Sequence, residues 1–380
     1  LVAAIGYGGR DVSRLRYTTE LTGDALGIGI AAAVFAVGLA VGGLVSGPIS
    51  DRFDPRRLLI VGIVLQGVVS LATAALLLND VTADSAFVAL TLVDGIFAGA
   101  CIPALATTQA AMVPSGARGA AEIMSILRLG IGAALGLFLA NLSPSPGVTL
   151  IAVGVVLCLV AWPIAVITRP VPIPRRADER EATGRVLATL ASHPVLRRVV
   201  VADLVLCVAV PTQFANVILA SDWEESLVTP VLVSGVLGVL VGRLTLSLTG
   251  SHGVVRRELL ESYGTFVALA LLGIPLIATS VIYTAVWIPA VVLFVGSATT
   301  AYAQGLLAAL VQQQVPDEVR GRLTGGMAAA RSLLIAGSAI LLTAVVVPFS
   351  ATAAAVLVAL LGVGALVVLR GFRGVTADAG

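Results

Sequence analysis

Charged residues are scarce in this sequence. Only 12% of its 380 residues are Asp, Glu, Lys or Arg, whereas a soluble domain carries about 25%. So little charge cannot cover the surface of a globule, which excludes a soluble protein. Lysine is absent altogether, because all 23 basic residues are arginine. That usage is typical of a GC-rich genome and predicts a bacterial source.

Cysteine and histidine are almost as rare. Cys101, Cys158 and Cys207 stand singly in apolar runs and no CxxC pair occurs, which argues against a disulfide framework and against a metal site. The two histidines, His193 and His252, lie far apart, and no HExxH, GxSxG or P-loop motif is present. We therefore expect neither an enzyme nor a bound cofactor.

Apolar residues, in contrast, make up 58% of the chain, and the mean hydropathy is +1.05. They fall into about 12 stretches of roughly 20 residues, each long enough to cross a ~30 Å hydrocarbon core as an α-helix. The expected fold class is an all-α membrane protein with transmembrane helices at residues 1–19, 25–49, 58–78, 87–113, 120–141, 148–168, 199–220, 231–248, 259–280, 285–311, 323–347 and 352–370. Because the chain opens inside an apolar run, we expect its native N-terminus to lie upstream.

Arginine alternates between the connections that join these stretches. The second, fourth, sixth, eighth and tenth connections and the C-terminal end carry arginine, and the others carry none. By the positive-inside rule, the arginine-rich side is cytoplasmic. We expect a multi-pass protein of the plasma membrane, here the bacterial inner membrane, with its central linker in the cytoplasm.

The chain contains a weak internal repeat. The sequence VPSGARG at 113–119 recurs as VPDEVRG at 315–321, and the pair Arg56-Arg57 recurs as Arg256-Arg257. Two matches at nearly the same offset predict a duplicated six-helix unit, an architecture found in transporters. We expect an N-terminal half (1–168), a cytoplasmic linker (169–198), a C-terminal half (199–371) and a cytoplasmic tail (372–380).

The connection between the second and third expected helices reads GPISDRFDPRR, residues 47–57. It resembles the signature loop of the major facilitator superfamily, Gly-x-Leu-(Ala/Asp/Ser)-Asp-(Arg/Lys)-x-Gly-x-(Arg/Lys)-(Arg/Lys), with Ile49 in place of leucine and Asp54 in place of glycine. The resemblance implies that Gly47, Asp51, Arg52, Arg56 and Arg57 form a latch between the halves that breaks during transport. The alternative is that these charges only set the topology.

The segments LTG (21–23), HPVLRR (193–198) and VPDEVRGR (315–322) look like those of the drug, macrolide and siderophore efflux branch of that superfamily. Two of that branch's features are missing here. The fifth expected helix lacks the proline of the antiporter signature, and Asp94-Gly95 stands where a basic residue is usual on the fourth. These departures weaken the assignment to proton-coupled drug antiport more than the assignment of the fold.

Several charges fall inside the apolar stretches, where each costs about 2.5–3.5 kcal/mol and so tends to face a cavity or a partner. Arg10, Asp11 and Arg14 share one face of the first helix at spacings of three and four residues. Guanidinium groups bind carboxylate and phosphate in bidentate fashion, so we expect Arg10 and Arg14 to bind an anionic or zwitterionic substrate. Asp11 is the first candidate to carry a coupling proton and Asp94 the second.

Other polar residues are expected at the same site. Arg128 and Arg331 lie 203 residues apart at almost equivalent positions of the repeat, and the seventh and tenth helices add hydrogen-bonding side chains. The additional substrate-binding candidates are therefore Arg128, Gln213, Asn216, Gln304 and Arg331. The alternative for each is ordinary interhelical pairing that fixes packing. Gly42, Gly43 and the other helix glycines are expected to serve close helix packing.

We expect a secondary active transporter that works by alternating access, with proton-coupled efflux of a small amphipathic or anionic molecule. One alternative is a lipid or anionic-metabolite carrier without proton coupling. Another, of a different class, is a transporter-like scaffold for a partner or for a domain beyond this chain. The expected partners are the lipid bilayer, a small-molecule substrate and a proton. The functional unit is expected to be a monomer, without nucleic acid or metal.

Overall fold

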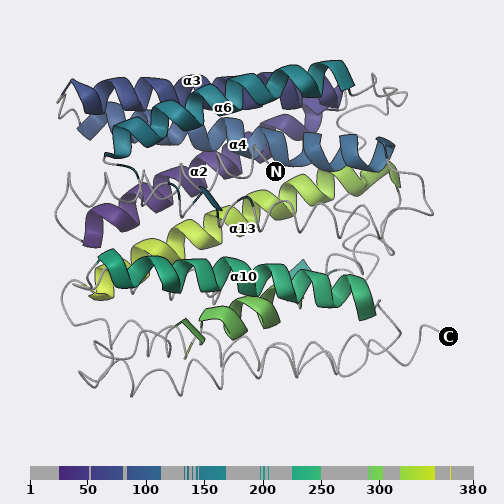
Figure 1. Ribbon diagram of the computed structural model, residues 1–380. Coiled ribbons are helices and arrows are strands. Elements are labelled where there is room, and N and C mark those ends of the chain that lie inside the picture. Colours follow the sequence, from purple (N-terminus) through teal and green to yellow (C-terminus); the bar gives the residue numbers. More distant parts are fainter. Residues whose placement is uncertain are drawn as a thin grey trace.

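The computed structural model of the protein describes residues 25–50, 53–79, 84–112, 143, 145–167, 225–249, 290–291, 293–302 and 317–346, together with a few single residues. The helices α2 (Ala25–Ser50), α3 (Pro55–Leu78), α4 (Asp84–Met112), α6 (Pro146–Ile167), α10 (Glu225–Thr249) and α13 (Asp317–Val346) lie in this part of the chain, and residues 293–302 are helical as well. Figure 1 shows these helices packed side by side, with their long axes in roughly the same direction.

Helices α2, α3, α4 and α6 confirm the expected spans 25–49, 58–78, 87–113 and 148–168 to within three residues at either end. All four are long and apolar enough to cross a membrane. Helices α10 and α13, however, begin six residues before the expected spans 231–248 and 323–347. Hydropathy marks only the part of a helix that lies in hydrocarbon, while backbone hydrogen bonding continues beyond it. The other expected spans and the linker at 169–198 lie largely or wholly outside the described residues.

The starts of α3 and α6 are set by the same local chemistry. Each helix has proline at its first position, where no backbone N–H is needed. Before it stands a side chain that accepts a hydrogen bond from a free backbone N–H of the first turn. Asp54 Oδ1 accepts from Arg56 N at 3.0 Å, and Ser145 Oγ accepts from Val148 N at 3.4 Å. These caps fix where the chain turns into each helix.

Side-chain size, rather than polarity, distinguishes the two faces of α2. Its buried face consists of alanine and glycine with one serine, Ser46, and Ala40 is only 1% exposed, whereas Val41, Leu44 and Val45 are exposed. Lipid tails are as apolar as leucine, so a membrane helix gains little by burying large apolar groups. It gains instead from small residues that let backbones approach closely. The size pattern therefore marks which face of α2 packs against protein.

Helices α2 and α4 cross in direct backbone contact. Gly38 and Gly42 on α2 face Gly95 and Gly99 on α4, and each pair is spaced four residues apart. A Cβ atom added to any of these four glycines would overlap a backbone carbonyl oxygen of the opposite helix. Small residues at this spacing form the close-packing motif of membrane helices. The contact leaves no room for a side chain or for rearrangement.

The same crossing occurs a second time, between α10 and the helical segment 293–302. Two glycines of α10 lie against backbone carbonyls of that segment, just as two glycines of α2 lie against backbone carbonyls of α4. Each glycine of the second crossing follows its counterpart in the first by 200 residues, and each residue that provides a carbonyl follows its counterpart by 202 residues. The pairs are Gly38 with Leu92 and Gly42 with Ile96 in the first crossing, and Gly238 with Phe294 and Gly242 with Ala298 in the second.

Helix α2 also packs along α13, as Figure 1 shows. Gly43 faces Gly325, and about two turns away Ala33 and Ala36 pack against Ala336. In these contacting pairs the residue numbers rise along α13 as they fall along α2, so the two helices are antiparallel. A Cβ at Gly43 would lie 3.8 Å from the Gly325 carbonyl oxygen, and a Cβ at Gly325 would lie 3.5 Å from that of Gly43. These are ordinary van der Waals distances, so α2 and α13 are in looser contact than α2 and α4.

The neighbouring residues Gly42 and Gly43 test this difference. Alanine favours a helix over glycine by up to about 1 kcal/mol, so Gly43→Ala should unfold at the wild-type temperature or slightly above it. Gly42→Ala forces a methyl group into the α4 backbone, and such overpacking costs about 1–3 kcal/mol, so its unfolding midpoint should fall. The measurement is thermal unfolding of the purified variants in detergent. Equal stability of the two variants would contradict the tight α2–α4 crossing.

Candidate functional site

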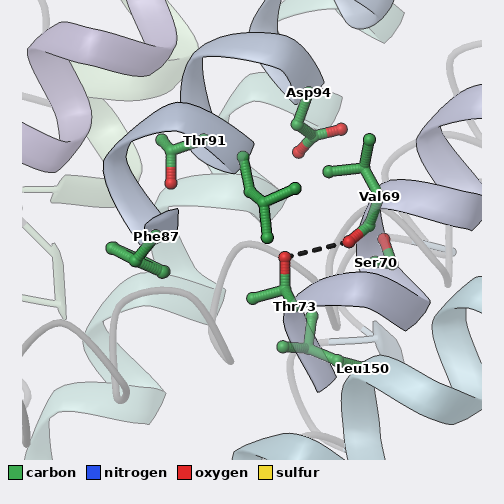
Figure 2. Close-up of a pocket in the computed structure, with 8 residues that line it drawn as sticks. Val69, Ser70, Thr73, Phe87, Thr91, Asp94 and Leu150 are labelled. Carbon is green, nitrogen blue, oxygen red and sulfur yellow. Dashed lines mark hydrogen bonds between the residues drawn. The ribbon is translucent and has the colours of Figure 1, made fainter. Parts of the chain in front are cut away.

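Helices α3, α4 and α6 enclose a small cavity beside a buried carboxyl group. The three helices pack through one apolar cluster that includes Leu59, Ala104 and Leu157. Beyond this cluster the cavity opens, with a volume of about 20 Å³, enough for one water molecule. Its polar lining comes from α3 and α4, and its apolar lining from all three helices. The lining residues are Ser70, Thr73, Thr91 and Asp94, with Val69, Phe87, Leu90 and Leu150 (Figure 2).

Asp94 lies within the membrane-crossing part of α4 and is only 2% exposed. Thr91, one turn earlier on the same face, is 3% exposed. In Figure 2 the Asp94 carboxyl group points toward Val69 of α3, while Thr91 lies nearer to Phe87 of its own helix. The prediction that Asp94 carries a coupling proton stays a prediction. The structure adds that the Asp94 carboxyl group borders the cavity that is lined by residues of α3, α4 and α6.

The hydroxyl groups on α3 donate their hydrogens to their own helix. Ser70 Oγ donates to the carbonyl oxygen of Gln66 at 2.9 Å. Thr73 Oγ1 donates to the carbonyl oxygen of Val69, also at 2.9 Å (Figure 2). A hydroxyl has one hydrogen and two lone pairs. Once its hydrogen is committed to the backbone, each oxygen can offer only lone pairs to the cavity. This side of the cavity therefore favours an occupant that donates hydrogen bonds or is positively charged.

A fully buried glutamine adds to the buried polar side chains of α3 and α4. Gln66 is 0% exposed, and its side-chain nitrogen donates to the Gly62 carbonyl at 3.3 Å and approaches Cys101 Sγ at 3.4 Å. Gln66, Ser70 and Thr73 follow one face of α3 at helical spacing. The sequence reasoning missed Gln66, although an amide in the middle of an apolar stretch, four residues before a serine, is a signal that could have found it.

A second buried polar group was also missed. The Thr300 hydroxyl, in the helical segment 293–302, is buried and has no hydrogen-bond partner. Nearby Ser297 is buried as well. Neither side chain lines the cavity beside Asp94. Within the described part of the chain, no group of three or more His, Cys, Asp or Glu could hold a metal ion.

The signature loop divides into parts with different roles. Gly47 lies in the last turn of α2, Asp54 caps α3, and Arg57 is exposed. Arg56 is half-buried, and its guanidinium donates to the carbonyl oxygen of Ala165 near the end of α6. This contact ties the start of α3 to the end of α6. Arg56 thus braces its own half of the described helices, and the latch role of the loop, Arg56 included, stays a prediction.

The remaining candidates lie mostly outside the described residues. Arg331 is on α13 and half-buried, and it does not line the cavity beside Asp94. The structure describes none of the other predicted site residues, so it does not show whether they meet. They are Arg10, Asp11, Arg14, Asp51, Arg52, Arg128, Gln213, Asn216 and Gln304.

Comparison with known proteins decides the family. The sequence pattern of the Major Facilitator Superfamily matches residues 15–339, which is most of the chain. The protein belongs to the major facilitator superfamily. This is a family of membrane transporters for small molecules, so the chain is a transporter by family rather than an enzyme.

The fold of this superfamily member is also found among solved structures. The structure of the human organic anion transporter MFSD10 (TETRAN) superimposes with a TM-score of 0.70 over 97% of this chain and 93% of that one. The two sequences are 14% identical, so the likeness concerns the fold alone. No curated protein matches the sequence closely enough to be compared.

The cap at the signature loop yields a prediction. Replacing a capping Asp by Ala costs about 1 kcal/mol, whereas Asn caps about as well as Asp. Asp54→Ala should therefore lower the free energy of unfolding by about that amount, and Asp54→Asn should not. The measurement is thermal unfolding of both variants beside the wild type. If the two variants lost stability equally, the charge of Asp54 rather than its cap would be the stabilising feature.

Proposed function

We propose that this protein is a secondary active transporter that exports a small amphipathic or anionic molecule in exchange for protons. It works by alternating access, in which two six-helix units move against each other around a central site. The observation that carries the proposal is the pair of glycine crossings, α2 with α4 and α10 with 293–302, joined through the looser contact of α2 with α13.

The repeated crossing supports two equivalent units. Four backbone contacts keep the same spacing at offsets of 200 and 202 residues, which are also the offsets of the Arg-Arg pair and of the VPxxxRG segment. Loop motifs alone could recur by chance. Agreement between loop motifs and helix contacts favours a duplicated unit, and parallel repeats of this kind place the substrate site between the halves.

The unequal tightness of the contacts supports movement between the units. Within a unit, α2 and α4 are in direct backbone contact at Gly38 and Gly42, with no room for even a methyl group between them. Between the units, Gly43 and Gly325 meet at van der Waals distance, and Ala33, Ala36 and Ala336 present only methyl groups. No large side chain interlocks α2 with α13 at these positions, so the two helices can tilt or slide against each other without breaking interdigitated packing. The units then move as rigid bodies.

An anionic substrate is favoured by two lines of support. Arginine is the only basic residue available, and Arg10 and Arg14 fall on one face of the first expected helix, where guanidinium groups suit carboxylate or phosphate. In addition, the structure with a similar fold is that of an organic anion transporter. The same features favour the second candidate function, a carrier of anionic lipids or metabolites that is not coupled to protons.

Proton coupling would supply the driving force. One charge that crosses a membrane potential of 100 mV gains about 2.3 kcal/mol, enough for a roughly 50-fold gradient of substrate. Asp11 and Asp94 are the carboxyl groups proposed to carry the proton, and Asp94 lies buried in a membrane-crossing helix.

The test is a flux assay in proteoliposomes with a panel of organic anions and amphipathic cations, with and without a pH gradient. We expect uptake or release of at least one anion to accelerate when the gradient is imposed. Asp94→Asn should lose that acceleration, whereas Asp54→Asn, a matched change at a helix cap, should keep it. Transport of an anionic lipid or metabolite that ignores the gradient would establish the uncoupled carrier instead. Absence of flux for every member of the panel would contradict both functions.

A further inference from the structure

Helix α10 presents the same faces as α2. The glycines through which each helix contacts a neighbouring backbone coincide at the offset of 200 residues, and the exposed positions coincide as well. Val37 is 38% exposed and its counterpart Leu237 is 39% exposed, while Val41 is 40% exposed and its counterpart Val241 is 41% exposed. Helix α10 therefore occupies the place in the second unit that α2 occupies in the first.

The counterpart of Gly43 on α10 is Arg243, again at the offset of 200 residues. Gly43 meets Gly325 of α13 across the boundary between the proposed units, so a side chain at the same position of α10 should also meet the other unit. Arg243 is half-buried and falls in the apolar stretch Val233–Thr245. An unbalanced charge within the membrane is costly, so the guanidinium group requires a negative partner at this boundary.

The repeat also indicates which residue that partner is. Helix α13 corresponds to the fifth expected helix, because a methionine and an arginine recur in both at an offset of 203 residues, one more than in the preceding VPxxxRG loop. The pairs are Met124 with Met327 and Arg128 with Arg331. At this offset the counterpart of Gly325 is Glu122, only two residues from the matched methionine. Glu122 lies outside the described residues, and the repeat alone places it.

We propose that Arg243 and Glu122 form an ion pair across the boundary between the two six-helix units. Where the first boundary contact has two glycines, the second has two opposite charges. The pair balances two groups that are each costly alone within the membrane, and an arginine can hold a carboxylate through two parallel hydrogen bonds. Asp203 and Glu261 also fall in apolar stretches, but in those of the second unit itself, so they are the competing partners in the test.

The pair makes the two sides of the boundary unequal. On one side α2 and α13 meet through small residues, and on the other α10 is held by charges that must separate before the helices do. Gly43 lies seven residues before the end of α2 at Ser50, and Arg243 lies six before the end of α10 at Thr249, so both contacts are at the same end of their helices. In the alternating access of the proposed function, on which this consequence rests, the pair keeps that end closed and breaks when it opens.

A double-mutant cycle tests the pair without any assay of transport. Removing one charge of a buried pair leaves the other without a partner and is strongly destabilising, whereas removing both is far less so. Arg243→Gln and Glu122→Gln should therefore each lower the unfolding midpoint by several degrees, and the double variant should unfold above both. Exchanging the charges, Arg243→Glu with Glu122→Arg, should likewise restore stability lost in either single reversal. The measurement is thermal unfolding of the full chain in lipid nanodiscs.

Arg331 provides the matched control. It is a half-buried arginine within α13, as Arg243 is within α10, but the repeat does not place it opposite Glu122. The stability losses of Arg331→Gln and Glu122→Gln should therefore add, as they do for residues that share no contact.

A pair of cysteines gives a second measurement of the same contact. Arg243→Cys with Glu122→Cys should form a disulfide on oxidation, because the proposed pair lies within the short reach that a disulfide requires. Arg243→Cys with Glu261→Cys should form none. Both pairs are made in a chain whose own cysteines, Cys101, Cys158 and Cys207, are replaced by alanine.

Additive losses in Arg243→Gln and Glu122→Gln would overturn the proposal, and so would rescue of Arg243→Gln by Asp203→Asn or Glu261→Gln instead. If neither single variant folds, the double variant decides, since it should fold with no charge left unpaired, and its failure would contradict the pair. Rescue in a protein that transports no member of the substrate panel would keep the pair and reject the proposed function. Additive losses in a protein with proton-driven flux would reject the pair alone.

Discussion

The backbone contact between α2 and α4 is the constraint on which the rest of the structure depends. Four glycines bring the two helices so close that a single methyl group would displace one of them. In a membrane no hydrophobic force presses helices together, and close van der Waals packing takes its place. The crossing holds α4 against α2, while α3 packs on another side of α4 and α6 packs along α3. The position of Asp94 between these helices follows from that arrangement.

The same principle explains why neighbouring contacts differ. Gly42 and Gly43 are adjacent in sequence but face different helices, one in backbone contact with α4 and the other in ordinary contact with α13. In the proposed mechanism, α2 therefore moves with α4, and the α2–α13 contact is the one that changes. Polar groups are expensive in the interior of such a bundle, and α3 and α4 bring several of them together, among them Gln66, Ser70 and Asp94. The repeat in α10 and 293–302 keeps the two glycines of α2 as Gly238 and Gly242, but it has neither the glycines of α4 nor the acid. The contact of the first helix in each pair is therefore retained without Asp94.

Much of the fold was predictable from sequence, because a helix that crosses hydrocarbon must be apolar over a fixed length. That rule located α2, α3, α4 and α6. It placed the starts of α10 and α13 six residues too late because Glu225 and Asp317 begin helices outside the apolar part. Asp94 stood out by its cost in the membrane. Ser70 and Thr73 of α3, which line the same cavity, could not be predicted as its neighbours. Which face of α3 meets α4 depends on contacts between residues that are far apart in sequence. Gly42 and Gly43 illustrate the same limit, since sequence predicts close packing for both and only the structure shows which backbone each one meets.

Movement between α2 and α13 is the central claim, and a reversible cross-link tests it most directly. Cysteines placed at Gly43 and Gly325, in a protein whose Cys101, Cys158 and Cys207 are replaced by alanine, lie at neighbouring backbone positions and should form a disulfide. The account predicts that oxidation stops substrate flux in proteoliposomes, that a reductant restores it, and that each single-cysteine protein stays active under both conditions. Full transport by the cross-linked protein would contradict the account.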